Sequence, residues 1–509
     1  MRLRVAALVL GLALGCGEET RTELWARLGD AEAQLALADR LAQTQGDARD
    51  AAGAAHWYRK AAEQGSPGAQ LALANLLESD GKLARDPGEA LRWLLAAAEG
   101  GAAEAQLRVA EAHAHGLGVP ADPAAAIGWY RKAAKQGLLA AQSELARRYQ
   151  SGDGVKADPG EAERWSQKAA ESGDAQAQLR LGLRYAEGRG VARDPAEAAR
   201  WLQRAAEAGL AEAQYLLANL LRHAAGARPD AVGAARWYAA AAEQGHVRAA
   251  FELGSMYLRG EAPPENEMQA FAWKSGMGGP ELEAVRWYRR AAEQGFAPAQ
   301  SGLGFLYAEG KGVTQDPAQA LEWLRKAAAQ GDASGQANLA ALYAKGQGVA
   351  QDDAEAVKWY RLAAQQGNRV AQLSLAVALA DGRGTARDER EAVSWYRRAA
   401  EQGSAEAQLG LGAMLSAGRG VAKDDAEAVL WYRRAAEQGL AMAQATLGAC
   451  YLQGLGVEKD YVQAHAWLTR SVAGGFERVK PVLAQLDKAL SPSERARSKQ
   501  LVEQAAAAH

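Results

Sequence analysis

Tryptophan recurs along this chain at intervals of 36 residues, and this period restricts the possible fold more than any other feature. The interval changes once, between Trp273 and Trp287, which lie 14 residues apart. An Ala-Gln pair and an aspartate keep the same step, with Asn266 in place of the aspartate at the irregular repeat. Because three residue types share one period, the 509 residues predict about twelve tandem repeats rather than several globular domains. The tryptophans of the series are Trp57, Trp93, Trp129, Trp165, Trp201, Trp237, Trp273, Trp287, Trp323, Trp359, Trp395, Trp431 and Trp467.

Each repeat has the pattern of two short helices joined by a turn. In one example, Gly304 and Tyr307 share a face of a first helix, and the glycine-rich residues 310–313 end it. Asp316 precedes a proline and predicts the N-cap of a second helix, which carries Trp323. Helices this short need their neighbours for stability, so the chain is expected to form an all-α, right-handed superhelical solenoid.

This pattern resembles a known repeat family. The segments 299–313 and 322–328, together with Asp316, are similar to the Sel-one-like repeat, a relative of the tetratricopeptide repeat, and the similarity extends over residues 23–490. The resemblance implies a scaffold or adaptor that holds a protein or peptide partner on a concave face, often in a bacterial envelope.

The first residues have the pattern of a targeting signal. Two arginines precede the apolar stretch 5–14, and small residues lead to Cys16. Residues 1–15 therefore resemble the signal peptide of a bacterial lipoprotein, which implies lipid attachment at Cys16 and a short tether over 16–22. Gly17 favours a periplasm-facing position on the outer membrane over the inner membrane. The alternative is an ordinary secretory signal cleaved near the same residues.

The irregular spacing suggests a division of the solenoid. We expect an N-terminal arm over 23–248, an irregular repeat with a 14-residue insertion over 249–298, a C-terminal arm over 299–480, and a capping helix and tail over 481–509. The insertion contains glycines and a proline that interrupt a helix, so an extra helix or a long loop is expected there, acting as a hinge. The alternative is a surface insertion that leaves the superhelix undisturbed.

Motifs for catalysis and for cofactors are not found in the sequence. The net charge of −2 argues against nucleic acid as the main partner, and no phosphate-binding loop occurs. His113 and His115 point to different sides of a helix, which argues against a metal site. The aspartate series is explained by capping, and Cys450 replaces apolar residues of other repeats. We therefore predict a protein without enzymatic activity, cofactor or metal; the alternative is a carrier or hydrolase acting on cell-wall material.

One face of the first helices is a candidate binding surface. If the Ala-Gln glutamine is position 0, the core residues at +3, +4 and +7 point one way, and we expect +2, +5 and +6 to point toward a partner. In the last five repeats none of these positions is charged, which is unusual for a solvent-exposed groove. The alternative is burial, by tight curvature or by residues 481–504. The candidate residues are Phe305, Leu306, Asn338, Ala341, Leu342, Val377 and Met414.

A second candidate lies in the N-terminal arm, where the same positions are charged. Four arginines, Arg147, Arg148, Arg180 and Arg184, could receive an acidic partner or a phosphate headgroup. The alternative, favoured by the nearby Glu144, is a solvated helix face whose charges pair with one another.

Overall fold

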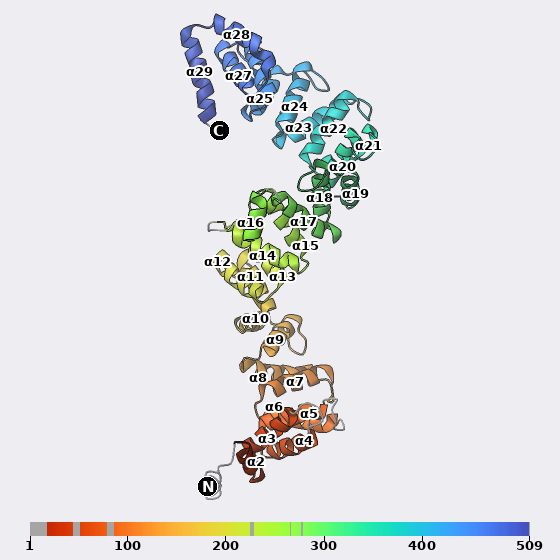
Figure 1. The fold of residues 1–509 in the computed structure, drawn as a ribbon, viewed down its shortest axis with the longest axis vertical. Helices are drawn as coiled ribbons and strands as arrows, with labels where there is room; N and C mark the ends of the chain where they lie inside the picture. Colours follow the sequence, from red (N-terminus) through yellow and green to blue (C-terminus); the bar gives the residue numbers. More distant parts are fainter. Residues whose placement is uncertain are drawn as a thin grey trace. The chain divides into compact units, whose positions relative to one another are not determined.

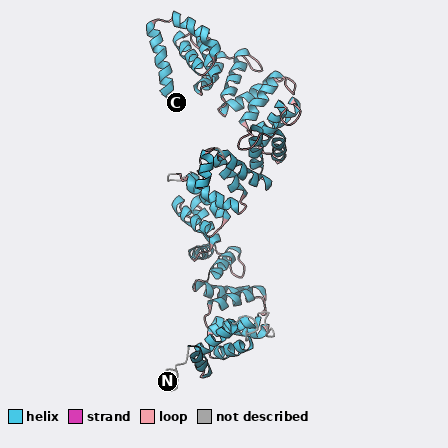
Figure 2. Ribbon diagram, in the orientation of Figure 1, coloured by secondary structure: helices cyan, strands magenta, loops and turns pink. Residues whose placement is uncertain are grey.

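The computed structural model describes residues 18–43, 51–78, 86–223, 229–264, 266–275 and 278–507, and these ranges contain helices but no strand (Figures 1 and 2). First helices, which carry the glutamine of the Ala-Gln pair in every repeat but the one of α15, alternate with second helices, which carry the tryptophan. This is the all-α solenoid that the 36-residue period predicts. The first helices are α3 Ala31–Gln43, α5 Pro67–Glu78, α7 Ala103–His115, α9 Leu139–Ser151, α11 Ala175–Glu187, α13 Ala211–His223, α15 Val247–Leu258, α18 Ala297–Glu309, α20 Ala333–Lys345, α22 Arg369–Asp381, α24 Ala405–Ala417 and α26 Ala441–Gln453. The second helices are α2 Glu18–Arg27, α4 Ala51–Glu63, α6 Pro87–Glu99, α8 Pro123–Lys135, α10 Pro159–Glu171, α12 Pro195–Glu207, α14 Ala231–Glu243, α17 Pro280–Glu293, α19 Pro317–Ala329, α21 Asp353–Gln365, α23 Glu389–Glu401, α25 Asp425–Glu437 and α27 Tyr461–Ala473.

The aspartate series caps the second helices, as predicted. The Asp316 carboxylate accepts hydrogen bonds from the backbone N–H groups of Ala318 and Gln319, both at 3.0 Å. Such a cap stabilises a helix by about 1 kcal/mol. Asn266 does the same for the extra helix α16 (Glu267–Lys274), while Asp50 lies outside the described residues. The other capping residues are Asp86, Asp122, Asp158, Asp194, Asp230, Asp352, Asp388, Asp424 and Asp460.

The Gly-x-Gly turn between the helices makes contact with the preceding repeat. Gly382 and Gly384 both have positive φ angles, of 71° and 67°, which favour glycine. A Cβ on Gly384 would lie 2.1 Å from the backbone oxygen of Asp353, at the start of the preceding second helix. The turn therefore packs backbone on backbone, which confirms its interpretation as a structural element.

The tryptophans pack the second helices but are not uniformly buried. Trp287 is 1 % exposed, whereas Trp323 and most of the others are half-buried. In most repeats a lysine or arginine three residues later covers the exposed ring face; Lys326 Nζ lies 4.3 Å from the centroid of the Trp323 ring. Glycine at +4 permits close helix packing, because a Cβ on Gly304 would lie 2.6 Å from Leu324 Cγ.

The buried glutamine of a first helix bonds to both neighbouring second helices where its partners are present. The Gln336 side chain donates to the carbonyl of Ala328 at 3.4 Å, and its Oε1 accepts a hydrogen bond of 2.8 Å from Gln366 Nε2 of the following second helix. The same pair recurs between Gln300 and Gln330. The Ala-Gln series is thus a series of joints that connect a first helix to the second helices before and after it, a role that the sequence alone did not indicate.

The chain divides into two compact units between Pro229 and Asp230. Unit 1 ends after α13 and unit 2 begins with α14. The sequence predicted a division at the irregular repeat 249–298, but the observed division lies before this repeat and follows residues 224–228, which are outside the described residues. The predicted hinge stays a prediction.

The irregular repeat in unit 2 contains an extra helix, α16, but this helix lies before the glycine- and proline-containing stretch in which an extra element was predicted. Helix α17 packs along α15 as the second helix of every other repeat of unit 2 packs along its first helix, so Trp287 holds the regular position. Helix α16, which carries Trp273, is therefore the additional element. The Trp273 ring lies edge-on to Tyr257 with 6.0 Å between the centroids.

The ends of the solenoid differ in part from expectation. Helix α2 already begins at Glu18, inside the range 16–22 assigned to a tether, because its helical pattern continues upstream. It spans 10 residues, whereas most second helices span 13. Residues 1–15 and Cys16 lie outside the described residues. Among the residues described, no helix is long and apolar enough to span a membrane.

The C-terminal end contains two helices where one capping helix was predicted over 481–509. These are α28 (Lys480–Ala489), preceded by the 3₁₀ turn Glu477–Val479, and α29 (Pro492–Ala507). Helix α29 begins with a capping box, since Ser491 N–H donates to Glu494 Oε2 at 2.8 Å and Glu494 N–H donates to Ser491 Oγ at 3.3 Å. Helix α29 packs mainly on α27, the last second helix.

Candidate interaction surfaces

The structure corrects the predicted binding face at position +6. Leu306 is fully buried, and Leu342 and Met414 are nearly so, which means that these side chains are in the core and not on a surface. The reason is that each first helix contacts neighbouring helices on more than one side. Leu342 and Met414 pack among the apolar residues of adjacent helices. The prediction of partner contact is therefore wrong for these three residues.

Positions +2 and +5 remain accessible and form an uncharged strip in unit 2. Phe305 is 39 % exposed and Ala413 is exposed, while Asn338, Ala341 and Val377 are half-buried. Because α29 packs mainly on α27, the C-terminal helices do not account for the partial burial of the strip. The strip consists of Gly302, Phe305, Asn338, Ala341, Ser374, Val377, Gly410, Ala413, Thr446 and Ala449.

A hollow of about 300 Å³ opens at the middle of this strip. Its wall combines Ser374 and Val377 of α22 with Tyr360 of α21, and Asp353 and Arg383 supply the only charges among its lining residues. Burial raises the pKa of the Tyr360 hydroxyl, so this group stays protonated and can donate a hydrogen bond. The hollow could receive one apolar side chain with a polar end.

The arginines of unit 1 do not form one free cluster. Arg147, Arg180 and Arg184 line a common hollow of about 580 Å³, but Arg148 is only 2 % exposed. Its Nε lies 2.8 Å from Glu144 Oε1, and its guanidinium lies 5.2 Å from the centroid of the Tyr130 ring. The prediction that Arg148 faces a partner is wrong, because its charge is compensated inside the protein.

Two of the remaining arginines also have internal partners. Arg147 Nη2 lies 2.6 Å from Glu144 Oε1, and Arg184 forms an ion pair with Glu163. Burial favours the neutral form of Glu144, but hydrogen bonds and the charges of Arg147 and Arg148 outweigh it and lower the pKa of this carboxyl. These pairs favour the alternative of a self-paired helix face over an acidic partner.

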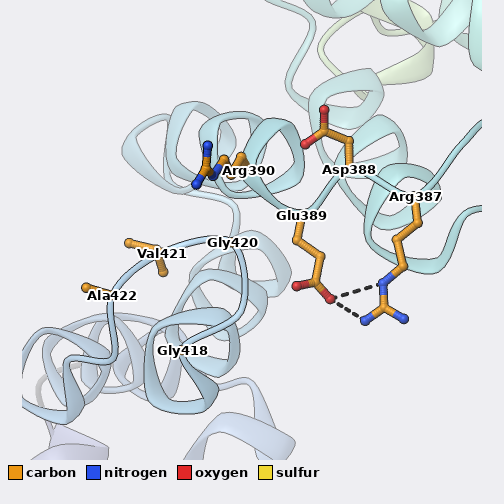
Figure 3. A pocket seen from close by; sticks show the side chains of 8 residues that line it. All are labelled: Arg387, Asp388, Glu389, Arg390, Gly418, Gly420, Val421 and Ala422. Atoms are coloured by element: carbon orange, nitrogen blue, oxygen red, sulfur yellow. Dashed lines mark hydrogen bonds and ion pairs between the residues drawn. The ribbon is translucent and has the colours of Figure 1, made fainter.

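A more polar hollow of about 810 Å³ lies between two inter-repeat turns of unit 2 (Figure 3). Its central carboxylate, Glu389, accepts hydrogen bonds from Arg387 Nε at 3.0 Å and from Arg419 Nε at 2.8 Å. Gly420 packs against the backbone oxygen of Glu389 in the manner of the other turns. The charges are satisfied within the turn, so this hollow is part of a joint between repeats.

Ser498, His465 and Asp487 form a hydrogen-bonded chain that resembles a hydrolase triad in composition. Ser498 Oγ lies 2.8 Å from His465 Nδ1, and Asp487 Oδ1 lies 3.0 Å from His465 Nε2. In a catalytic triad the serine bonds Nε2 and the aspartate bonds Nδ1, the reverse of this arrangement. Ser498 is 1 % exposed within α29, so a substrate cannot reach it. The chain connects α27, α28 and α29.

Other chemistry-bearing residues also have structural places. Cys450 packs in the core of unit 2, and burial raises the pKa of its thiol, which keeps it protonated and unreactive. In the described part of the chain, no group of three or more histidine, cysteine, aspartate or glutamate side chains could hold a metal ion.

Comparison with known proteins identifies the repeat. The Sel1 repeat model matches thirteen segments between residues 31 and 476. The chain belongs to the Sel1 repeat family. Two of the segments, 247–273 and 281–296, are the halves of the seventh repeat on either side of the inserted residues, so the match agrees with twelve repeats. Sel1 repeats support a role as a protein-interaction scaffold.

Solved structures of Sel1 repeat proteins resemble this chain. A protective antigen of uropathogenic Escherichia coli with an SLR fold is 34 % identical, covers 89 % of this chain and 94 % of its own, and superimposes with a TM-score of 0.69. A Sel1 repeat protein from Oxalobacter formigenes is 28 % identical over 74 % of this chain and 92 % of its own, with a TM-score of 0.36. No curated protein matches the chain.

Proposed function

We propose that this Sel1 repeat protein is a non-enzymatic scaffold, anchored to the membrane of a bacterial envelope, that binds a protein or peptide on the uncharged strip of unit 2. The observation that carries the proposal is the strip itself. Over five consecutive repeats, accessible positions of the first helices lack charge, although charged residues occupy equivalent positions such as Arg108 and Glu144 in unit 1. A partner that removes water from these positions pays no penalty for burying an unpaired charge.

Charge introduced into the strip tests the binding site. Ala413→Arg and Ala341→Arg place guanidinium groups on the strip, and Ala329→Arg adds the same group at an exposed position of the second helix α19 as a control. We expect cross-linking in intact cells to lose its captured partner with the first two variants and to keep it with the control. Circular dichroism must show unchanged helix content. Retained capture in both folded strip variants would refute the site.

The membrane anchor is proposed from the sequence around Cys16. We propose that its lipid holds the protein on the periplasmic side, on the outer membrane in preference to the inner one. Metabolic labelling with tritiated palmitate is expected to mark the wild-type protein and to leave Cys16→Ala unlabelled in the soluble fraction. A labelled Cys16→Ala protein, or an unlabelled wild type, would exclude lipidation at this residue.

A further inference from the structure

The residue that follows the repeat tryptophan is large in every regular repeat but one. It is tyrosine in seven repeats and leucine in four, and it is Ser166 in the fourth repeat. The large residues are Tyr58, Tyr130, Tyr238, Tyr288, Tyr360, Tyr396 and Tyr432, with Leu94, Leu202, Leu324 and Leu468. Only in the fourth repeat is this side chain too small to reach across the space between two first helices.

The structure shows what this side chain normally fills. Tyr288 lies between position +4 of its own first helix and position +2 of the next, because a Cβ on Gly254 or on Gly302 would lie 2.6 Å from its ring. Tyr396 lies equally close to position +2 of the next first helix, with 2.5 Å to a Cβ on Gly410. Each regular repeat therefore contains a slot between consecutive first helices that its own tyrosine or leucine occupies.

In the fourth repeat this slot is open. The equivalent of position +4 is Ala146 on α9, the equivalent of +2 is Arg180 on α11, and both line the 580 Å³ hollow together with Ser166. This volume is within the usual range of ligand sites. Ser166 and Ala146 have small side chains, so the floor of the hollow lies deep between the helices. Equivalent hollows beside Leu94 and Tyr360 have volumes of about 500 Å³ and 300 Å³, so the hollow widens as the side chain at this position becomes smaller.

The rim of the hollow favours a phenol over an aliphatic group. In intact slots the tyrosine hydroxyl bonds position +5 of the first helix, as in the 2.7 Å bond from Tyr58 Oη to Asp39 and the 2.9 Å contact of Tyr288 with Ser255. Position +5 of α9 is Arg147, whose guanidinium can donate to a phenol oxygen. Ser143 of α9 also lines the hollow; its hydroxyl donates to Asp174, and its oxygen can accept a hydrogen bond from the phenol O–H.

We propose that this hollow binds the tyrosine side chain of a partner peptide, which completes the fourth repeat from outside. The proposal rests on the proposed scaffold function and adds a second contact site in unit 1. Exposed Arg180 lies where a peptide would enter, and its guanidinium can stack on the bound ring. Leucine side chains fit the slot less well, because they offer no hydrogen-bonding group to the rim residues Arg147 and Ser143.

The proposal is tested by substitutions of Ser166 that place a larger side chain in the slot. Ser166→Tyr and Ser166→Leu restore the residues of the other repeats, and Ser166→Ala keeps the slot open as the matched control. The probe is N-acetyl-L-tyrosinamide, observed by saturation-transfer NMR with the full chain, and N-acetyl-L-alaninamide measures nonspecific contact. We expect binding by the wild type and Ser166→Ala, and at least tenfold weaker binding by both filled variants. Equal binding by all four proteins, or no binding by the wild type, would overturn the proposal.

Two further measurements keep the outcome clear. Filled variants are expected to unfold at the same or higher urea concentration than Ser166→Ala, because they copy intact repeats; unfolding at lower urea would show that the slot is not equivalent and overturn the proposal. Arg180→Ala, which leaves the slot open, is expected to weaken binding of the tyrosinamide probe several-fold. If Ala413→Arg abolishes partner capture while the filled variants still bind the probe, the scaffold stands and the tyrosine slot fails. Loss of the probe in the filled variants with intact capture in Ala413→Arg would support the slot and refute the strip.

Discussion

A glutamine at position 172 is expected to complete a joint that the fourth repeat lacks. Gln142 donates to the carbonyl of Ala134 at 3.2 Å, but its buried Oε1 has no hydrogen-bond partner. In the joint of Gln300, the Oε1 accepts from a glutamine 30 residues later, Gln330, at 2.8 Å. The residue 30 positions after Gln142 is Ser172, which cannot reach.

The backbone at Ser172 already suits the substitution. Its φ and ψ are −81° and −2°, against −81° and 0° at Gln330, and the side chain is exposed. Ser172→Gln would satisfy a buried acceptor, an effect of about 1–3 kcal/mol, and would lose up to about 2 kcal/mol of side-chain entropy. We expect a net stabilisation of about 1 kcal/mol around the joint, which slows hydrogen exchange about fivefold in α9 and α10.

Matched variants separate the hydrogen bond from other effects. Ser172→Glu has nearly the same shape but no donor when ionised, so it should not slow exchange. Gly100 and Gly474 hold the same place after Gln70 and Gln444, whose Oε1 atoms are also unpartnered. A Cβ on Gly100 would lie 2.9 Å from Pro67, and a Cβ on Gly474 would lie 3.0 Å from Ala441. Replacing either glycine with glutamine is therefore expected to stabilise the protein less than Ser172→Gln. Exchange no slower in Ser172→Gln than in Ser172→Glu would refute the reasoning.

Three other predictions concern the turns, the ion pairs and the C-terminal cap. Gly384→Ala should lower the free energy of unfolding by at least about 2 kcal/mol more than Gly403→Ala, since both have positive φ but only Gly384 packs against backbone; equal urea midpoints would contradict this. The pKa of Glu144 is lowered from its ordinary value of 4.5, so this carboxylate stabilises the fold above pH 4.5, and the stabilisation is lost as the pH falls through the folded-state pKa. Glu144→Gln should therefore reduce the change in the urea midpoint between pH 7 and pH 3. An unchanged pH dependence would count against the pairing of Glu144 with Arg148. Ser498→Ala should speed hydrogen exchange in α29 and leave other helices unchanged, and uniform acceleration would argue against a local role.

The period, the caps and the turns could be predicted because each depends on local chemistry. An aspartate before a helix start has few other roles, and Asp316 caps its helix as expected. The binding face could be predicted only in part, because the prediction assigned each first helix one buried side and one solvent-exposed side. Leu306 contradicts that division: a first helix packs between several helices, so its buried arc is wider. A recurrent large apolar residue at +6 was the signal for this burial.

The fourth-repeat slot and the glutamine joints depend on contacts between repeats. Ser166 looks unremarkable within its own helix, and only the position of Tyr288 between two first helices gives its small size a meaning. Likewise, the pairing of Gln336 with Gln366 connects residues 30 positions apart on different helices. Such roles become visible in the sequence only when the repeats are aligned and compared position by position.

The recurrence of the same glutamine joint has a consequence for how a gene of this kind can change. The same bond crosses consecutive junctions of this region, from Gln372 to the carbonyl of Ala364 and from Gln408 to that of Ala400, so the two sides of these junctions are interchangeable. Deletion or duplication of one 36-codon block in this region would bring together surfaces that already fit. The number of blocks can therefore change by unequal recombination while each new junction keeps this glutamine bond.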